Sequence, residues 1–510
     1  MKRLLLFMIV LTTVASCTSE EPNVQPNIIF FLADDLGYGE VGSYGQQKIQ
    51  TPHIDALAQS GMRFTQHYSG APVCAPARYV FLTGKHLGHA YIRGNDEWFE
   101  RGDVWDYAKA SADPGLEGQR PIPNSTVTIA HRLKEAGYNT GLFGKWGLGA
   151  PDTEGVPNAQ GFDYFYGYNC QRQAHNLYPT YLWEDDRKEF LQNALVSPGT
   201  KLDSIADPFA EESYAQFEQK EYAPAKIHEK ALAFLKKQNK KDPFFMYYAS
   251  PLPHLPLQVP KEYVDMYKEK FEEDVPYEGE TGYFPNRTPR TAYAAMITYL
   301  DDQLGKLVAT LKEQGLYENT LIVFTSDNGP TYLGGVDFDF FESSKPFTNG
   351  FGRTKGFVYE GGIRVPMIAA WPGRIDGGTV SDHVSAFYDF MPTFCELAGV
   401  GTPEGVDGIS LLGSFFSQAQ EEHDFLYWEF PSYNGQQAVR LGNWKGIRKD
   451  IFDGNLEIEL YDLNIDLAEQ NNVAAKHEDV LLKIEKIMAR EHEQAVNPSF
   501  RIKQLGDHLK

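Results

Sequence analysis

Residues 28–35 read IIFFLADD, an apolar run that ends abruptly in Asp34 and Asp35. Because the run does not alternate between apolar and polar residues, it predicts a strand buried on both faces. In an open α/β sheet, ligands bind beyond the carboxyl ends of the strands, so we expect the polar residues after such runs to meet at one edge. Three further runs end in this way: residues 140–143 before Lys145, 244–248 before His254, and 321–324 before Asp327 and Asn328.

Segments with helical spacing separate these runs, and several of them end in glycine after the last turn. They are residues 54–61, 127–137, 225–237 and 292–315. Strands that alternate with helices predict an α/β fold with a large mixed, mainly parallel sheet flanked by helices.

The pattern changes after about residue 420. Short strand-like pieces follow at residues 425–430, 438–441, 444–448 and 457–460, and a helix-like stretch follows at 480–490. This order predicts a small antiparallel sheet with one helix. With a chain of 510 residues, we expect a large domain at residues 27–420 and a C-terminal α+β subdomain at residues 421–510.

Three stretches lack clear periodicity and are rich in aromatic, charged or proline residues: residues 95–124, 169–222 and 259–290. Long irregular insertions often build binding pockets. We expect them to surround a site at the edge of the sheet.

The formal net charge of −22 argues against nucleic acid and against an anionic membrane surface as partners, because both need clustered lysine and arginine. It would also repel an anionic substrate at long range. Such a substrate therefore requires a pocket that concentrates a few cations locally.

The first residues are typical of a targeting signal. Lys2 and Arg3 precede an apolar run at residues 4–14, and the sequence VASC at residues 14–17 resembles the cleavage box of bacterial lipoproteins. We predict a signal peptide at residues 1–16, a lipid on Cys17 and a polar tether at residues 17–26, in an exported, envelope-anchored protein that is either periplasmic or exposed at the surface. The alternatives are an ordinary signal peptide or a transmembrane anchor, for which the run is short.

The chain has four cysteines, too few for a disulfide scaffold in an exported protein. Cys17 and Cys74 have predicted roles. For Cys170 and Cys395 we expect buried free thiols and predict no disulfide.

The segment CAPAR at residues 74–78, followed by LTG at 82–84, resembles the maturation signature of the formylglycine-dependent sulfatases of the alkaline phosphatase superfamily. The other blocks of that family follow in the same order over nearly the whole mature chain. They are residues 27–39, Gly144-Lys145-Trp146, Pro253-His254, residues 326–329, Lys355-Gly356 and residues 360–366.

The resemblance implies that a maturase oxidises Cys74 to formylglycine. The hydrated aldehyde would then attack sulfur, and its second hydroxyl would expel sulfate by collapsing back to the aldehyde. The alternative for Cys74 is a small buried apolar residue. The proline at position 76 and Arg78 favour an exposed turn instead.

Asp34, Asp35, Asp327 and Asn328 can supply oxygen ligands, and no histidine or cysteine lies near them in the sequence. This favours a hard cation such as Ca²⁺ over zinc. The resemblance implies that these four residues and the formylglycine oxygen at Cys74 hold one calcium ion, which would polarise the sulfuryl group. It also makes Asp327 the candidate base. The alternative for one of the aspartates is a helix cap.

Sulfate transfer places negative charge on oxygen atoms and therefore requires preorganised cations. Lys145, Lys355 and Arg78 match the cationic positions of the family. His254 matches the histidine that contacts sulfate and can protonate the leaving alcohol.

One departure concerns the position two residues after the motif lysine, where the family commonly has histidine and this chain has Gly147. Either another histidine replaces it, with His175 as the first candidate, or this branch works without one. Arg93 and His175 are the predicted substrate-binding residues; for Arg93, in a stretch that also contains His86 and His89, a helix end with a solvated loop is an equal alternative.

These features predict a sulfatase that acts on O-sulfate groups of saccharides from sulfated polysaccharides. One rival is a phosphonate or phosphate ester hydrolase of the same superfamily. The other is an inactive lipoprotein that binds sulfated glycan, although the presence of Cys74, Lys355, His254 and the metal ligands argues against it.

Overall fold

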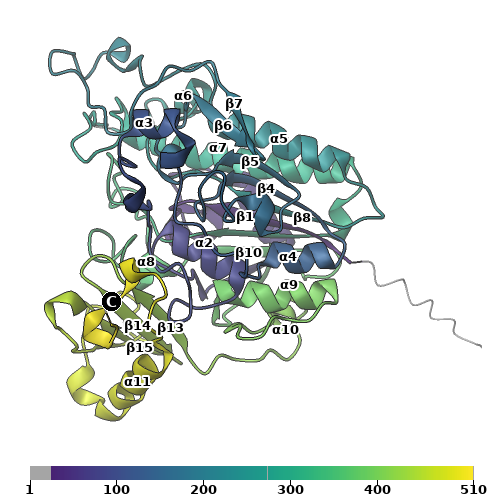
Figure 1. Ribbon diagram of the computed structural model, residues 1–510, viewed down its shortest axis with the longest axis vertical. Coiled ribbons are helices and arrows are strands. Elements are labelled where there is room, and N and C mark those ends of the chain that lie inside the picture. Colours follow the sequence, from purple (N-terminus) through teal and green to yellow (C-terminus); the bar gives the residue numbers. More distant parts are fainter. Residues whose placement is uncertain (1–24, 273, 509–510) are drawn as a thin grey trace, which may run out of the picture.

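The computed structural model describes residues 25–272 and 274–508. A sheet of ten strands, in the order β11-β2-β10-β9-β1-β8-β4-β5-β6-β7, runs through the centre of the larger part (Figure 1). Five neighbouring strands, β9-β1-β8-β4-β5, are parallel to one another. They are β1 (Asn27–Ala33), β4 (Asn139–Lys145), β5 (Tyr164–Tyr168), β8 (Phe244–Ala249) and β9 (Thr320–Ser326). The predicted mixed, mainly parallel sheet is confirmed.

The outer strands complete this sheet with mostly antiparallel pairings. They are β2 (Met62–Phe64), β6 (Tyr181–Glu184), β7 (Arg187–Phe190), β10 (Met367–Ala370) and β11 (Thr379–Ser381). A short separate pair consists of β3 (His67–Tyr68) and β12 (Ser385–Ala386).

The position of β1 inside the sheet explains why apolar and polar residues do not alternate in its sequence. Ile28, Phe30 and Leu32 belong to one hydrophobic cluster, whereas Ile29 and Phe31 belong to another. The first cluster packs under α2 (Cys74–Thr83), α4 (Ile129–Glu135) and α9 (Phe390–Ala398), and the second under α1 (Pro52–Ser60), α5 (Ala223–Lys237) and α7 (Pro289–Glu313). Both faces are therefore covered by helices, as Figure 1 shows.

Four of these helices, α1, α4, α5 and α7, lie where helical spacing predicts them. Helix α2 was not predicted, because every one of its residues is buried and it has no polar face to give a periodic pattern. The irregular insertions hold only short elements, among them α3 (Tyr107–Ala112) and α6 (Lys261–Tyr267). Two further short helices are α8 (Glu360–Ile363) and α10 (Leu412–Phe415).

The C-terminal part forms the expected antiparallel sheet, β13-β14-β15-β16. Its elements are β13 (Leu426–Phe430), β14 (Gln436–Leu441), β15 (Trp444–Arg448), β16 (Glu459–Asp462) and α11 (Glu478–Glu491). Ile484 and Met488 of α11 pack against Tyr427 and Val439 of the sheet. Trp428 faces the other way, into the core of the larger part, so the two sheets share packed contacts.

Cys170 and Cys395 are buried free thiols, as expected. The predicted signal peptide and Cys17 lie outside the described residues. Among the described helices, none is long and apolar enough to cross a lipid bilayer.

The parallel strands approach closely beside Lys145. Gly144 of β4 has φ 117° and pairs with Gly167 of β5. A Cβ atom at position 144 would overlap the carbonyl oxygen of Ala249 in β8. Glycine is therefore required at this point for both backbone conformation and space.

We predict that Gly144→Ala lowers the free energy of unfolding by about 3 kcal/mol or more, because it adds a strained φ angle to an overlap in the core. Urea denaturation followed by circular dichroism measures this. Gly401→Ala is the control, since a Cβ there meets only the end of Arg132. Equal stability of the two variants would contradict the requirement at Gly144.

Candidate active site

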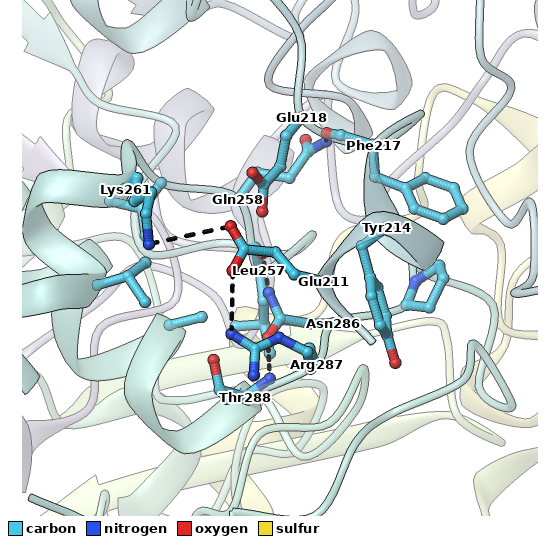
Figure 2. A pocket seen from close by; sticks show the side chains of 14 residues that line it. Glu211, Tyr214, Phe217, Glu218, Leu257, Gln258, Lys261, Asn286, Arg287 and Thr288 are labelled. Carbon is cyan, nitrogen blue, oxygen red and sulfur yellow. Dashed lines mark hydrogen bonds and ion pairs between the residues drawn. The ribbon is translucent and has the colours of Figure 1, made fainter. Parts of the chain in front are cut away.

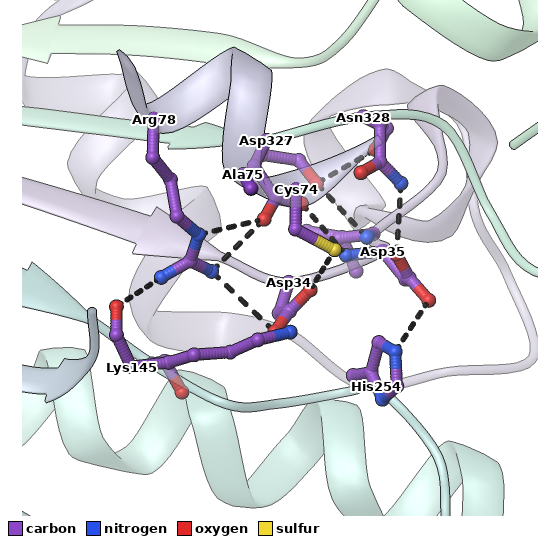
Figure 3. Close-up of polar contacts among 12 residues, drawn as sticks. Asp34, Asp35, Cys74, Ala75, Arg78, Lys145, His254, Asp327 and Asn328 are labelled. Atoms are coloured by element: carbon purple, nitrogen blue, oxygen red, sulfur yellow. Dashed lines mark hydrogen bonds and ion pairs between the residues drawn. The ribbon is translucent and has the colours of Figure 1, made fainter. Parts of the chain in front are cut away.

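The carboxyl ends of three parallel strands bring five of the predicted polar residues together (Figure 3). Asp34 and Asp35 follow β1, Asp327 and Asn328 follow β9, and Lys145 ends β4. All five residues are completely buried. Because β1 lies between β9 and β8 in parallel register, the meeting of these side chains at one edge is confirmed.

Asp34 contacts three side chains of the site. Its Oδ2 accepts from Lys145 Nζ at 2.6 Å and lies 3.4 Å from Arg78 Nη2, and its Oδ1 accepts from Cys74 Sγ at 3.3 Å. Burial alone would raise the pKa of Asp34, but Lys145 and the other nearby cations outweigh burial and hold that pKa far below its usual range. Asp34 is therefore ionised.

Asp35 has a left-handed backbone with φ 66°, which is unfavourable for a residue other than glycine. Its carboxylate accepts from Lys355 Nζ at 2.5 Å and from Asn328 Nδ2 at 2.8 Å, and it lies 3.7 Å from His254 Nε2. Burial raises the pKa of Asp35, and the charge of Lys355 offsets this only in part. These contacts hold Asp35 in its left-handed backbone conformation.

Arg78 holds Asp327. Its Nε and Nη2 donate to Oδ2 of Asp327 at 3.2 and 2.9 Å, and its Nη1 donates to the carbonyl oxygen of Lys145. Burial, and next to it the charge of Asp34, raise the pKa of Asp327 to about 7. Arg78 follows Cys74 by four residues in α2, so helical geometry places both side chains on one face.

Cys74 is the first residue of α2 and is only 1% exposed. The expectation of an exposed turn is wrong, because α2 packs on all sides and buries its first residue. Burial, with a further contribution from Asp34, raises the pKa of the Cys74 thiol far above its usual value. The thiol is therefore protonated at neutral pH and is a poor nucleophile in this form.

His254 lies on the loop after β8. Its Nδ1 is 2.6 Å from the carbonyl oxygen of Leu255, which can only accept, so Nδ1 carries a proton. Burial, with a further contribution from Lys355, lowers the pKa of His254 well below its usual value. The ring of His175 stacks on His254 with centroids 5.0 Å apart, so this predicted residue does reach the site.

A cavity of about 280 Å³ opens onto Cys74, His254 and Lys355. Each of the three irregular insertions contributes to its wall, as expected. The lining side chains from these insertions are Asn95, Gln171, His175 and Tyr283, and the others are Val73, Thr331, Tyr332, Leu333, Phe430, Ser432 and Tyr433. Gln171 and the tyrosines were missed in the sequence analysis, because no motif marks them and only the folded loops bring them to the cavity.

Arg93 does not line the cavity, so the structure does not support its predicted role as a substrate ligand. It is 2% exposed, and its guanidinium donates to Glu429 at 2.8 Å and to the carbonyl oxygens of Ala90 and Gly88. These contacts join the loop after α2 to strand β13. Its neighbours also form structural pairs, since His86 contacts Glu491 and His89 contacts Asp407.

A second cavity, of about 50 Å³, lies between the insertions at residues 169–222 and 259–290 (Figure 2). Glu211 lies there within 4.0 Å of Lys261 and 3.9 Å of Arg287. None of the predicted site residues is among its lining side chains. The chemistry of the chain is therefore assigned to the first cavity.

The site reached from the first cavity through Cys74, His254 and Lys355 combines buried carboxylates suited to a cation, three cationic side chains, and Cys74 at the start of α2. This constellation defines a hydrolase for anionic esters. Residues 26–400 match the sulfatase family, and residues 351–495 match the C-terminal region of N-sulphoglucosamine sulphohydrolase. The chain belongs to the sulfatase family and is a sulfuric ester hydrolase.

Named relatives agree with this assignment. Human arylsulfatase A is 30% identical over 82% of this chain and 74% of its own length. Mouse N-acetylgalactosamine-6-sulfatase is 28% identical over 82% of this chain and 71% of its own length. Among solved structures, Ps i-CgsB in complex with k-i-k-neocarrahexaose has a TM-score of 0.70 and 27% identity, and the match covers 95% of both chains.

Proposed function

We propose that this sulfatase removes O-sulfate groups from saccharides, with a formylglycine formed from Cys74 and one bound Ca²⁺. The observation that carries the proposal is the meeting of Cys74, four oxygen-bearing side chains and three cations at one edge of the sheet, where Cys74 and Lys355 also line a cavity. This arrangement offers a nucleophile position, a cation site and positive charge for sulfate in one place.

The residues present fit a hard cation. Asp34, Asp35 and Cys74 have ligand atoms within 4.8 Å of one another, in a group that also includes His254. Oδ1 of Asn328 is buried and has no hydrogen-bond partner within the described part of the chain. An orphaned carbonyl oxygen beside two carboxylates is a suitable ligand for Ca²⁺.

Charge balance gives a second reason for a cation. The site contains the carboxylates of Asp34, Asp35 and Asp327, each in contact with at least one of the cations Lys145, Lys355 and Arg78. When all three carboxylates are ionised these charges cancel, so protein groups alone then give no excess positive charge for an anionic ester. A calcium ion held by Asp34, Asp35, Asp327 and Asn328 would supply that excess and polarise the sulfuryl oxygens.

Cys74 needs conversion to act. The buried thiol stays protonated because its pKa is raised, so attack by a thiolate is unfavourable. Oxidation to formylglycine by a separate maturase, with an external oxidant, would replace the thiol by an aldehyde whose hydrate supplies the attacking hydroxyl. Asp327 is the proposed base for that hydroxyl, since Arg78 fixes its carboxylate from one side.

His254 is the proposed acid for the leaving alcohol. Because its Nδ1 proton is committed to Leu255, only Nε2 can deliver a proton to the substrate. Nε2 must therefore be protonated when the ester is bound, and the negative charge of the ester favours that state. Lys145 and Lys355 lie where they can stabilise charge on the sulfuryl oxygens.

The proposal of a saccharide rests on the cavity wall and on the similar proteins. Tyr283, Tyr332, Phe430 and Tyr433 line the cavity; their aromatic faces suit the faces of sugar rings, and the hydroxyl groups of the three tyrosines suit the polar edges. A similar structure binds a neocarrahexaose. A phosphonate or phosphate ester hydrolase remains the rival activity, and a glycan-binding protein without activity is the second rival.

We predict that the matured protein releases sulfate, and not phosphate, from one member of a panel of sulfated saccharides and phosphoesters, measured by ion chromatography. Cys74→Ala should lower the rate by about 10⁴-fold or more, because it removes the nucleophile. Peptide mass spectrometry establishes that Cys74 carries the aldehyde.

Cys395→Ala is the matched control, since this buried cysteine lies in α9 outside the cavity. It should retain activity. Phosphate release would assign the rival hydrolase, and glycan binding with no release of either anion would assign the inactive binder.

We further propose that the protein is exported and anchored in the bacterial envelope by a lipid on Cys17. The support is the sequence of residues 1–17. We predict that the wild type sediments with membranes and that Cys17→Ala does not, while the neighbouring Ser19→Ala behaves as the wild type. Release of the wild type without detergent would contradict the anchor.

A further inference from the structure

The loop after β5 is held against the loop after β4. The amide of Trp146 donates to the carbonyl oxygen of Tyr168 at 2.9 Å, and the amide of Gly147 donates to that of Asn169 at 3.2 Å. The pairing of the two strands therefore continues past their ends. Gln171 follows Asn169 by two residues, so its backbone position relative to Gly147 is fixed.

The side chain of Gln171 occupies the space above Gly147. A Cβ atom at position 147 would overlap this side chain, and its three nearest atoms all belong to Gln171. Gly147 also has φ 79°, a conformation that favours glycine. Gln171 thus fills the volume that a side chain at position 147 would take, two residues after Lys145.

The side-chain amide nitrogen of Gln171 is a hydrogen-bond donor without a partner in the described part of the chain. The residue is 4% exposed, and its Nε2 has no hydrogen-bond partner among residues 25–272 and 274–508. A buried N–H group without a partner is unfavourable and needs an explanation, such as a catalytic role or a bound water or ion. Gln171 lines the same cavity as Cys74, His254 and Lys355.

We propose that the side-chain amide of Gln171 donates a hydrogen bond to an oxygen of the sulfuryl group in the bound ester. This inference rests on the proposed function, because it takes a sulfate ester as the ligand. Lys145, Lys355 and Arg78 each contact a carboxylate, whereas Gln171 is neutral and has its donor unused. His175 contacts His254 instead. None of the three atoms nearest to a Cβ at position 147 belongs to His175.

The test measures inorganic sulfate binding to the matured, calcium-loaded full chain by isothermal titration calorimetry. Gln171→Leu keeps the approximate size of the side chain and removes the donor. We expect its Kd for sulfate to rise about 10-fold to 100-fold, the range for a lost hydrogen bond to a charged group. Its Tm should not fall, because the removed donor has no partner in the free protein.

Gln173→Leu is the matched control. Gln173 lies on the same turn and is also buried, but its Nε2 donates to Tyr181 Oη and it does not line the cavity. Its Kd for sulfate should stay within about twofold of the wild-type value. Its Tm should fall, because the variant loses one buried hydrogen bond.

A sulfate Kd for Gln171→Leu within about twofold of the wild type would overturn the proposal, as would equal losses in the two variants or no sulfate binding by the wild type. These results concern anion binding alone. Ester hydrolysis is measured separately, on the saccharide panel, so failure of the Gln171 inference and failure of the proposed function are distinguishable.

Discussion

The pairing of three buried carboxylates with two buried cations, Lys145 and Arg78, and the half-buried Lys355 is the constraint on which this structure depends. Asp34, Asp35 and Asp327 lie at the ends of adjacent parallel strands, where like charges would repel each other strongly in a medium of low polarity. Lys145, Lys355 and Arg78 each neutralise one of them. A burial of this kind is costly for stability and is explained by chemistry that needs charge in a dry pocket.

The rest of the fold serves to hold these groups in register. The close approach of strands at Gly144 places Lys145 beside Asp34, and helix α2 places Arg78 one turn after Cys74. The C-terminal sheet takes part as well, because Phe430, Ser432 and Tyr433 complete the cavity wall. Its attachment includes the buried ion pair of Arg93 with Glu429.

Much of this arrangement could be predicted from the sequence, because it follows from strong local patterns. Apolar runs that end in aspartate identify β1 and β9 and the edge at which they meet, and the motif residues Cys74, Arg78, Lys145, His254 and Lys355 all lie at the site. What could not be predicted depends on contacts between distant segments. The sequence places Arg93 in a pocket, because it does not show that Glu429 of β13 binds the guanidinium. It also predicts an exposed Cys74, because it does not show that α2 is buried.

Gln171 is a second residue whose place at the site depends on contacts between distant segments. The sequence reveals that Gly147 lacks a side chain, but the residue that fills the space comes from another loop and carries no motif. Its place became visible only through the overlap at Gly147 and the unpartnered amide.

The account requires that the carboxylates at the end of β1 hold a hard divalent cation, and calcium titration of metal-free protein by calorimetry tests this most directly. It predicts that one Ca²⁺ binds per chain and that Asp35→Asn weakens binding by about 10-fold or more. Asp302→Asn, in a separate acidic group on the long helix α7, should bind as the wild type does. A folded wild type that binds no calcium, or an Asp35→Asn variant with unchanged affinity, would contradict the account.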